Sequence, residues 1–587
     1  MFEQERATTE AVILDYLRQN GIPLPEEIKW VPIPFSGEWG ISTTLFPVAA
    51  QEARLGREVK VPLRAQEIAE GISHHLGTPP GFSRVEAVKG YLNLYYSTGE
   101  FSRQVVDSVL EQGARFGYAP ARGETVMVEY SQPNTHKPLH VGHLRNMILG
   151  AAICNILEAA GYTVIRANYP GDTGLHVIKW LWNYLRKHNG EEPPADKIRW
   201  MGDLYAEANR ELEADPELEP EMRALFKRWD AREPELMALW EKTRQWSIAG
   251  FDDAYAALDI RFDKYYWQSE LDEPGKQVVD ELIARGIAAD ERPEGSVVVH
   301  LDELLGLEKE KYRVMVALRS DGTALYATWD LALAIRKFAD YDLVKSIYII
   351  DVRQSLHFQQ VFKTLDLMGQ PWFDRLYHLP YEIVNLPGNV TMASREGTVV
   401  LLEDLLREAI QRAREVNLEK NPDLDEGTRE AVAKAVAIGA IKYPMLSRDN
   451  MKIATFDWES ALDFNGQAAP YIQYAQVRAN SILRKTGGAS PGSVTPAHDL
   501  HPTEIQLIDL IARVPAEILR AAEEYKTLHV TNAAYEIARA FSDFYNHCPV
   551  LTVEPEIRAY RLRLVAATRQ TLVNLLCILG IAAPDVM

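Results

Sequence analysis

An alternation of strand, helix and strand over residues 125–169 constrains the fold of this chain more than any other feature. Residues 125–130 form a short β-branched run, and residues 163–169 form a second one. Between them, apolar residues recur at helical spacing over about residues 140–160, and Gly161 suits a helix C-terminus. We therefore expect one βαβ unit of a parallel, doubly wound, Rossmann-like α/β sheet.

The rest of the chain fits a larger protein built around that unit. A length of 587 residues predicts three or four domains at about 150 residues each. Residues 1–120 mix helix and strand signals in a small α+β domain, and a charged, mostly helical insertion covers about residues 180–275. Strand and helix alternate again over residues 343–384, as expected for the second half of the same sheet. From residue 402 onward the pattern is almost wholly helical and ends in an α-helical bundle.

Composition limits the classes of function. The net charge of −20, from 63 basic and 83 acidic residues, argues against a uniformly basic nucleic-acid binder. Residues 466–587 nevertheless hold 11 residues of each sign, which allows a local basic face. The three cysteines form no CxxC pair, so neither a disulfide framework nor a zinc site is supported, and we expect no metal-ligating residues. Because no run of 18 apolar residues and no signal-peptide core occurs, we expect a cytoplasmic protein with no membrane partner.

The loop before the first predicted helix carries the residues best suited to chemistry. His140 and His143 are three residues apart, so their imidazoles share one face at the start of a helix, where backbone amides favour anions. Gly142 lets a flat ring approach the backbone, and Lys137 adds a positive charge. These features favour a nucleotide seat at the carboxyl end of the first strand. A metal-binding pair is the alternative, although such pairs usually stand four residues apart with an adjacent carboxylate.

The motif EYSQPNTHKPLHVGHLR at residues 129–145 resembles the signature region of the class I aminoacyl-tRNA synthetases, specifically the arginyl-tRNA synthetase family. The resemblance extends to RSDGT at residues 319–323, YATWD at 326–330, DVRQSLHFQQ at 351–360 and GQAAPYIQYA at 466–475. It spans essentially the whole chain, and the combination of motifs is specific.

The resemblance implies three parts and one reaction. Residues 1–120 would be an N-terminal additional domain that contacts the tRNA elbow. Residues 121–400 would be the class I catalytic domain with its helical insertion, and residues 401–587 a helical stem and anticodon-binding domain. The enzyme would activate L-arginine with ATP to arginyl-adenylate and transfer the arginyl group to the 3′ end of tRNA(Arg). The expected protein is a monomer, and Mg²⁺ would be held mainly by the phosphates of ATP.

The resemblance also assigns residues to arginine. A guanidinium needs planar acceptors for its five donors, and Tyr326 and Asp330, four apart on an expected helix, would hold it. An exposed pair on a helix surface is the alternative for these two residues. Contacts to the α-amino and carboxylate groups would come from Glu129, Ser131 and Asn134 at the end of the first strand, with a further contact from Gln354.

For ATP, the resemblance implies contacts from His140, Gly142 and His143. His357, which opens a helix after a predicted strand, would lie beside the adenine or ribose. A core or helix-capping histidine is the alternative for His357.

The second class I signature, usually Lys-Met-Ser-Lys, corresponds here to TMASREG at residues 391–397, which lacks both lysines. The charge that grows on the leaving pyrophosphate must still be neutralised, and Lys137 and Arg395 are the candidates, of which we favour Lys137. Met392 and Ser394 would still contact ATP, and the catalytic set is Lys137, His140, His143 and Arg395.

Three points stay open in the sequence. In GDTGLH at residues 171–176 the family usually has Trp and Gln where this chain has Thr173 and His176, so the roles of Asp172 and His176 are undecided. The degenerate loop leaves a non-catalytic tRNA-binding relative as an alternative, and a different class I synthetase or a small nucleotidyltransferase as another. Basic residues of the C-terminal region that are candidates for tRNA binding are Arg478, Arg484, Lys485, Arg558, Arg561 and Arg563. We expect the last three to reach phosphates, and a solvated helix face is the alternative.

Overall fold

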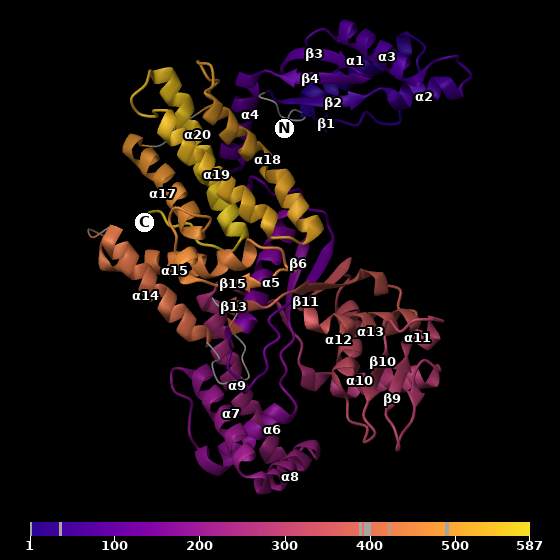
Figure 1. Cartoon of the computed structure of the whole chain (residues 1–587), viewed down its shortest axis with the longest axis vertical. Coiled ribbons are helices and arrows are strands. Elements are labelled where there is room, and N and C mark those ends of the chain that lie inside the picture. Colours follow the sequence, from indigo (N-terminus) through magenta and orange to yellow (C-terminus); the bar gives the residue numbers. More distant parts are fainter. Residues whose placement is uncertain are drawn as a thin grey trace. The chain divides into compact units, whose positions relative to one another are not determined.

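The computed structural model describes residues 3–33, 38–386, 390–391, 401–420, 422, 424–487 and 492–587 (Figure 1). The chain divides into two compact units, each of which is built from segments far apart in the sequence. The first unit comprises Met1–Phe116, Ala475–Val514 and Glu536–Asn574, and the second comprises Gly117–Tyr474, Pro515–Tyr535 and Leu575–Met587.

The first unit begins with a four-stranded antiparallel sheet in the order β1-β2-β4-β3. In β4, Leu92, Leu94 and Tyr96 alternate with more exposed residues, and α3 packs against β3 and β4. This is the α+β character that the sequence predicts for this region. The elements are α1 (Glu3–Gln19), β1 (Val31–Pro32), β2 (Gly40–Thr44), α2 (Phe46–Arg54), α3 (Val61–Leu76), β3 (Phe82–Val88), β4 (Tyr91–Tyr96) and α4 (Thr98–Gln112).

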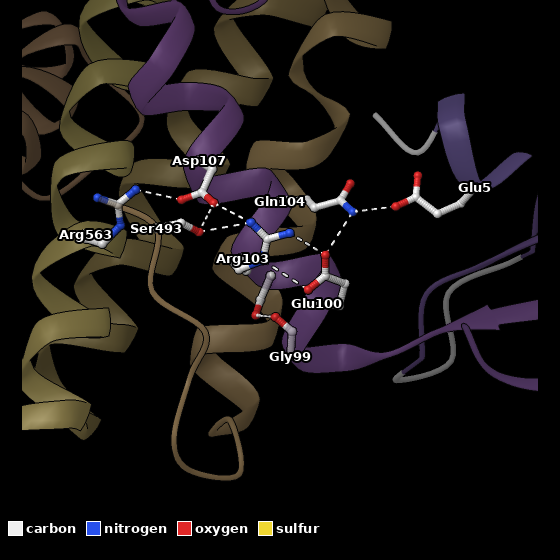
Figure 2. A network of polar contacts seen from close by, with 9 residues as sticks. Glu5, Gly99, Glu100, Arg103, Gln104, Asp107, Ser493 and Arg563 are labelled. Carbon is white, nitrogen blue, oxygen red and sulfur yellow. Dashed lines mark hydrogen bonds and ion pairs between the residues drawn. The ribbon is translucent and has the colours of Figure 1, made fainter. Parts of the chain in front are cut away.

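A buried carboxylate connects α4 to the C-terminal segments of the same unit (Figure 2). Asp107 accepts hydrogen bonds from Arg103 Nη1 at 2.9 Å, from Arg563 Nη2 at 2.6 Å and from the Ser493 hydroxyl. Asn574 donates from its side-chain amide to the carbonyls of Gly113 at 2.9 Å and Phe116 at 3.0 Å. Residues separated by more than 380 positions in the chain are thereby held together.

The structure contradicts the expectation that Arg561 and Arg563 contact phosphates. Both side chains are buried, because Arg561 pairs with the fully buried Glu504 at 2.9 Å and Arg563 pairs with Asp107. Arg558 is exposed, so it stays a candidate for a phosphate contact, and the exposed Arg484 and Lys485 stay candidates for tRNA binding. These basic residues and Glu504 lie in α17 (Ala469–Thr486), α18 (Pro502–Glu524) and α20 (Pro555–Ile578), and α19 (Leu528–His547) is the remaining helix of this region.

The second unit is organised around a five-stranded parallel sheet in the order β12-β11-β5-β6-β7. The predicted βαβ unit is confirmed as β5 (Thr125–Glu129), α5 (Val141–Ala159) and β6 (Thr163–Asn168), and the predicted second half as β11 (Lys345–Asp351), α13 (Ser355–Leu367) and β12 (Leu376–Tyr381). In register, Glu129 at the end of β5 pairs with Ala167 of β6 and Tyr348 of β11. The predicted α/β fold class is therefore confirmed.

Close packing fixes α5 against the sheet. A Cβ on Gly150 would lie 2.2 Å from Cγ of Tyr130, so only glycine allows the helix to approach the end of β5 this closely. Leu144, Met147 and Ile148 of the same helix are buried. The start of α5, which holds the histidine pair, is thus positioned rigidly at the carboxyl end of β5.

Two further layers flank the sheet. The insertion is helical and has its own aromatic core, in which Trp180 stacks on Tyr184 and meets Trp200 edge-on. Its helices are α6 (Leu175–Asn183), α7 (Lys197–Ala214), α8 (Glu219–Asp230) and α9 (Pro234–Ala257). The other layer combines helices with a small antiparallel sheet. Its helices are α10 (Asp272–Ala284), α11 (Leu301–Leu304) and α12 (Tyr326–Asp340), and its strands are β8 (Ala289–Asp290), β9 (Val297–His300) and β10 (Val314–Leu318). The short strand β7 (Lys264–Tyr265) belongs to the main parallel sheet.

A helical stem completes the second unit. The buried ammonium of Lys442 in α15 donates to the carbonyls of Leu258 at 2.7 Å and Gly580 at 2.5 Å, and burial lowers the pKa of Lys442 to about 8. The stem elements are β13 (Val384–Leu386), β14 (Val390–Thr391), α14 (Leu402–Lys420), α15 (Glu426–Leu446), β15 (Ala454–Thr455) and α16 (Trp458–Ala461). Within the described parts of the chain, the helices are all too short or too polar to cross a membrane. The division at residues 120 and 400 stays a prediction.

The Asp107 network makes a prediction about stability. Asp107→Ala leaves the buried Arg563 guanidinium without its carboxylate, so we expect a loss of about 3 kcal/mol from the free energy of unfolding of the first unit. Urea denaturation followed by circular dichroism measures this loss. Glu38→Ala, which removes the exposed partner of Arg84, is the matched control and should cost less than about 1 kcal/mol. Equal losses in the two variants would show that the buried Asp107–Arg563 pair contributes no more to the free energy of unfolding than an exposed pair does.

Candidate functional site

The loop between β5 and α5 is held in an unusual backbone conformation. Three residues that are not glycine have positive φ angles, namely Ser131 at 78°, Gln132 at 45° and His136 at 61°. Such conformations cost about 1–3 kcal/mol each and persist only where surrounding contacts enforce them. Strain of this kind is concentrated at functional sites, which directs attention to this loop.

Side-chain amides provide those contacts. Asn146 Oδ1 accepts from the backbone N–H of Ser131 at 2.5 Å, and its amide nitrogen donates to the Ile349 carbonyl of β11 at 2.8 Å. Asn168, at the end of β6, accepts from the backbone N–H of Gln132 at 3.1 Å. The loop is therefore fastened to both neighbours of β5 in the sheet.

The two histidines of the motif cap the start of α5. His140 Nδ1 accepts from the backbone N–H of Gly142 at 3.0 Å, and His143 Nδ1 accepts from the backbone N–H of His140 at 3.2 Å. The ring centroids are 3.9 Å apart. Because Nδ1 is an acceptor in both rings, each neutral ring carries its proton on Nε2 and can donate it to a ligand.

Burial keeps both rings neutral. Burial lowers the pKa of His143 to about 3, with further lowering by His140 and Lys137, and burial and Lys137 also lower the pKa of His140. The Lys137 ammonium lies 5.0 Å from the ring centroid of Tyr205 in α7. Lys137 is thus close enough to the helix start to act electrostatically on the pair, as the sequence predicts.

A pocket of about 470 Å³ lies at the carboxyl ends of the parallel strands. All six residues that the sequence analysis assigns to arginine line it, together with His143. They come from the loop after β5, from α12 and from the turn after β11, so the fold gathers three distant motifs. The predicted members are Glu129, Ser131, Asn134, Tyr326, Asp330 and Gln354.

Two carboxylates in this pocket already have cationic or hydrogen-bonding partners. Glu129 forms a fully buried ion pair with Lys337 of α12, with Oε2 and Nζ 2.5 Å apart. Burial lowers the pKa of Lys337, and the nearby Glu129 carboxylate opposes that shift. Asp330 Oδ2 lies 2.5 Å from His357 Nε2. His357, expected beside the adenine or ribose, is therefore placed against the acid that is expected to bind arginine.

The remaining predicted pocket residues differ in how freely they face the cavity. Tyr326 is 70% exposed, and its ring meets Trp329 edge-on. The Ser131 hydroxyl is buried and shares a 2.7 Å hydrogen bond with the Tyr255 hydroxyl, so the protein already occupies it. Asn134 lies against Gly171, where an added Cβ would come within 2.3 Å of Asn134 Oδ1.

The open question about Asp172 and His176 receives a structural answer. Asp172 is fully buried and accepts from Arg244 Nη1 at 2.9 Å and from the Ser269 hydroxyl at 2.7 Å, so it fastens α9 to the sheet. His176 Nε2 lies 3.4 Å from the Gly171 carbonyl, and burial lowers the pKa of His176 to about 3. Neither residue lines the pocket.

Sequence reasoning missed several pocket residues. Tyr169 follows β6, Ile350 and Asp351 end β11, and Tyr381 ends β12, so all four lie at carboxyl ends of parallel strands. The strand-end rule could have found them, because ligands of such sheets bind at that edge. The further lining residues that were missed are Gln132, Asn146, Gly171, Gln268 and Phe358.

Part of the predicted nucleotide site cannot be placed. Met392, Ser394 and Arg395 lie outside the described residues. Among the residues that are described, no group of three or more His, Cys, Asp or Glu side chains could hold a metal ion. The site therefore combines an acidic pocket, suited to a cation, with a helix start that offers neutral imidazole and backbone donors to an anion.

Comparison with known protein families gives two matches. The family described as "tRNA synthetases class I (R), catalytic domain" matches residues 105–458, and the "DALR anticodon binding domain" matches residues 472–587.

Curated proteins and solved structures agree with these matches. The arginine–tRNA ligase of Clostridium perfringens is 36% identical over 529 residues, covering 89% of this chain and 90% of that protein. The arginine–tRNA ligase of Alkaliphilus metalliredigens is 33% identical over 571 residues, covering 97% of each. The structure of Thermus thermophilus arginyl-tRNA synthetase is similar with a TM-score of 0.77 and 29% identity, covering 99% of this chain and 100% of that one. The Plasmodium falciparum arginyl-tRNA synthetase shares the fold, with a TM-score of 0.71 at 19% identity and coverage of 99% of each chain.

The state of the histidine pair can be tested directly. Because the pKa of His143 is near 3, its ¹⁵N resonances in histidine-labelled protein should report the neutral Nε2–H tautomer without titrating between pH 5 and 8. The His143→Asn variant assigns the signals. The unfolded chain binds this proton first, so His143 should also lower the stability of the fold as pH falls from about 6.5 towards 3. A titration midpoint near 6.5 would contradict the buried, capped arrangement.

Proposed function

The chain belongs to the class I arginyl-tRNA synthetase family, and from this membership we propose which of its residues carry out the ATP-dependent ligation of L-arginine to tRNA(Arg). Members of this family use ATP, and the predicted identity of the chain as an arginine–tRNA ligase is confirmed. The individual residue roles are our proposal. The observation that carries them is the gathering of six residues from three separate motifs in one pocket that also includes His143.

We propose that Asp330 and Tyr326 hold the guanidinium of arginine. Asp330 supplies a planar carboxylate that can accept two parallel N–H donors, and the exposed Tyr326 supplies a phenol oxygen. His357 Nε2 lies 2.5 Å from Asp330 Oδ2, which supports a role for His357 in orienting that acid. His357 also stays a predicted contact of the adenine or ribose.

The α-amino and carboxylate groups of arginine are assigned to residues at the end of β5. Asn134 lines the pocket after β5 and is free to form these contacts, and Gln354, in the turn after β11, is proposed to add a further contact to the substrate. Glu129 and Ser131 also line it, but Lys337 and Tyr255 already pair with them. Their proposed contribution is therefore a shared one, in which each keeps its internal partner while it meets the substrate.

ATP is proposed to lie over the start of α5. The base would lie on the bare backbone at Gly142, and the Nε2–H donors of His140 and His143 would contact the triphosphate. An arginine carboxylate oxygen then attacks the α-phosphorus, the bond from that phosphorus to the bridging oxygen breaks, and pyrophosphate leaves. In the second step, a ribose hydroxyl of the terminal adenosine of tRNA attacks the arginyl carbonyl, and AMP leaves.

The charge on the leaving pyrophosphate needs a further cation. Lys137 is the favoured candidate because its charge already acts on both histidines at the helix start. Arg395 is the other candidate, and Met392 and Ser394 are proposed to contact ATP from the same loop. Mg²⁺ is proposed to arrive with ATP as part of the nucleotide substrate, because the described side chains offer no carboxylate cage.

Three broader features are also proposed. The C-terminal region, which matches the DALR anticodon binding domain, would bind the anticodon, and residues 1–120 would contact the tRNA elbow. The protein would act as a monomer in the cytoplasm.

Arginine use tests the proposed function and its pocket together. With tRNA present, the purified chain should exchange pyrophosphate into ATP with arginine and with none of the other standard amino acids. Asp330→Asn removes the charge partner of the guanidinium, so kcat/KM for arginine should fall about 100-fold or more while the KM for ATP changes less than about threefold. Asp366→Asn, at a partly exposed pair with Lys363, is the matched control and should behave like the wild type. A silent wild type would favour the non-catalytic relative, and unchanged arginine kinetics in Asp330→Asn would refute the pocket assignment.

The missing signature lysine makes a separate prediction. Lys137→Ala should lower kcat for pyrophosphate exchange at least about tenfold more than Arg395→Ala does, because Lys137 is the charge next to the helix start. Steady-state kinetics with saturating ATP and arginine separate this effect from binding. The reverse order of the two variants would assign the charge to the loop.

A further inference from the structure

Tyr169 occupies a position in the pocket that the proposed residue roles do not use. It follows Asn168, the last residue of β6, and lines the cavity with Glu129, Tyr326 and Asp330. The polypeptide then continues through Pro170 to Gly171 at the same edge of the sheet. Tyr169 therefore approaches the proposed arginine site from a strand that supplies none of the other assigned contacts.

The hydroxyl of Tyr169 is buried and lacks a hydrogen-bond partner among the described residues. Around it, Glu129 Oε1 accepts from Gln132 and the Asp172 carboxylate accepts from Arg244 and Ser269, whereas Glu129 Oε2 and Lys337 Nζ form an ion pair at 2.5 Å without hydrogen-bond geometry. An unsatisfied buried hydroxyl costs about 1–3 kcal/mol. Groups of this kind are uncommon in folded proteins, and because Tyr169 lines the pocket, a bound ligand can supply the missing partner.

The surroundings define the chemistry of that partner. Burial raises the pKa of Tyr169 well above its usual value, and the carboxylates of Asp330, Glu129 and Asp172 raise it further, so the phenol stays neutral. A neutral phenol beside carboxylates can accept one N–H from a cation and direct its own proton to an acid. A guanidinium has five N–H donors, so a bidentate contact to Asp330 and one to Tyr326 leave donors free.

We propose that the Tyr169 hydroxyl is a specificity-determining contact that accepts an N–H donor from the guanidinium of arginine. This inference rests on the proposed arginine site and adds a third acceptor to it. A lysine ammonium is a compact point charge and does not present donors in the planar fork that can reach three fixed acceptors at once. Binding lysine would leave the buried phenol without a partner, which is how a site built on hydrogen bonds rejects a near analogue.

Tyr169→Phe removes one atom and tests the contact. With tRNA present, the KM for arginine in pyrophosphate exchange should rise about tenfold or more, while the KM for ATP stays within about twofold. Agmatine, which keeps the guanidinium but lacks the α-carboxylate, serves as a competitive inhibitor. Its Ki should rise by a similar factor, because the lost contact is to the guanidinium.

A matched control separates this effect from a general loss of packing. Tyr266→Phe removes the hydroxyl of another buried tyrosine, whose hydrogen bond to Asp340 at 3.3 Å lies outside this pocket, and should leave both constants unchanged. The arginine-to-lysine ratio of kcat/KM should fall in Tyr169→Phe and stay constant in Tyr266→Phe.

The other outcomes overturn the proposal in distinguishable ways. A KM for arginine in Tyr169→Phe that stays within twofold of the wild-type value would rule out the proposed contact. A raised KM for arginine with an unchanged Ki for agmatine assigns Tyr169 to the α-carboxylate instead. Weaker arginine, agmatine and ATP binding together with a lower Tm indicates a structural role. If the wild type itself does not use arginine, the proposed function fails before Tyr169 is considered.

Discussion

The side-chain amide of Asn146 holds the loop on which the active site depends. It accepts from Ser131 at the strained turn after β5 and donates to Ile349 in the neighbouring strand β11. Positive φ angles in residues other than glycine are costly, so the turn can exist only because such contacts enforce it. This turn places Asn134 at the pocket, and the chain then continues to the start of α5, where His140 and His143 cap the helix.

Charge compensation inside the protein makes the acidic pocket possible. Glu129 and Asp330 both line a cavity of about 470 Å³, and unpaired carboxylates at this depth would be strongly destabilised. Lys337 forms an ion pair with Glu129, and His357 contacts Asp330. The two acids differ in consequence. Glu129 pairs with a fully buried lysine, whereas Asp330 contacts a histidine that is partly exposed.

The sequence could predict the parts of the site that follow from periodicity and motif, and it could not predict their internal partners. Strand, helix and strand were recognisable from β-branched runs and helical spacing, and the strand-end rule located the site at the carboxyl edge of the sheet. Glu129 pairs with Lys337, which is more than 200 residues away in the chain. This pairing depends on the register between β5 and β11 and on how α12 packs beside them. Arg561 and Arg563 were misjudged for the same reason, because their ion-pair partners are distant in the sequence. Their charges suggested a phosphate-binding face, but the fold buries both arginines in ion pairs with Glu504 and Asp107.

Internal compensation also resolves how a chain of net charge −20 can bring a polyanion beside an acidic pocket. The start of α5 offers the Nε2–H donors of two imidazoles that burial keeps neutral by lowering their pKa values. Carboxylates without a partner in the adjoining pocket would repel a triphosphate, because Coulomb interactions are weakly screened where water is excluded. Lys337 and Lys137 contribute positive charge on the two sides of the boundary. The proposed cation site and polyanion site can therefore be neighbours because Glu129 and Asp330 already have partners within the protein.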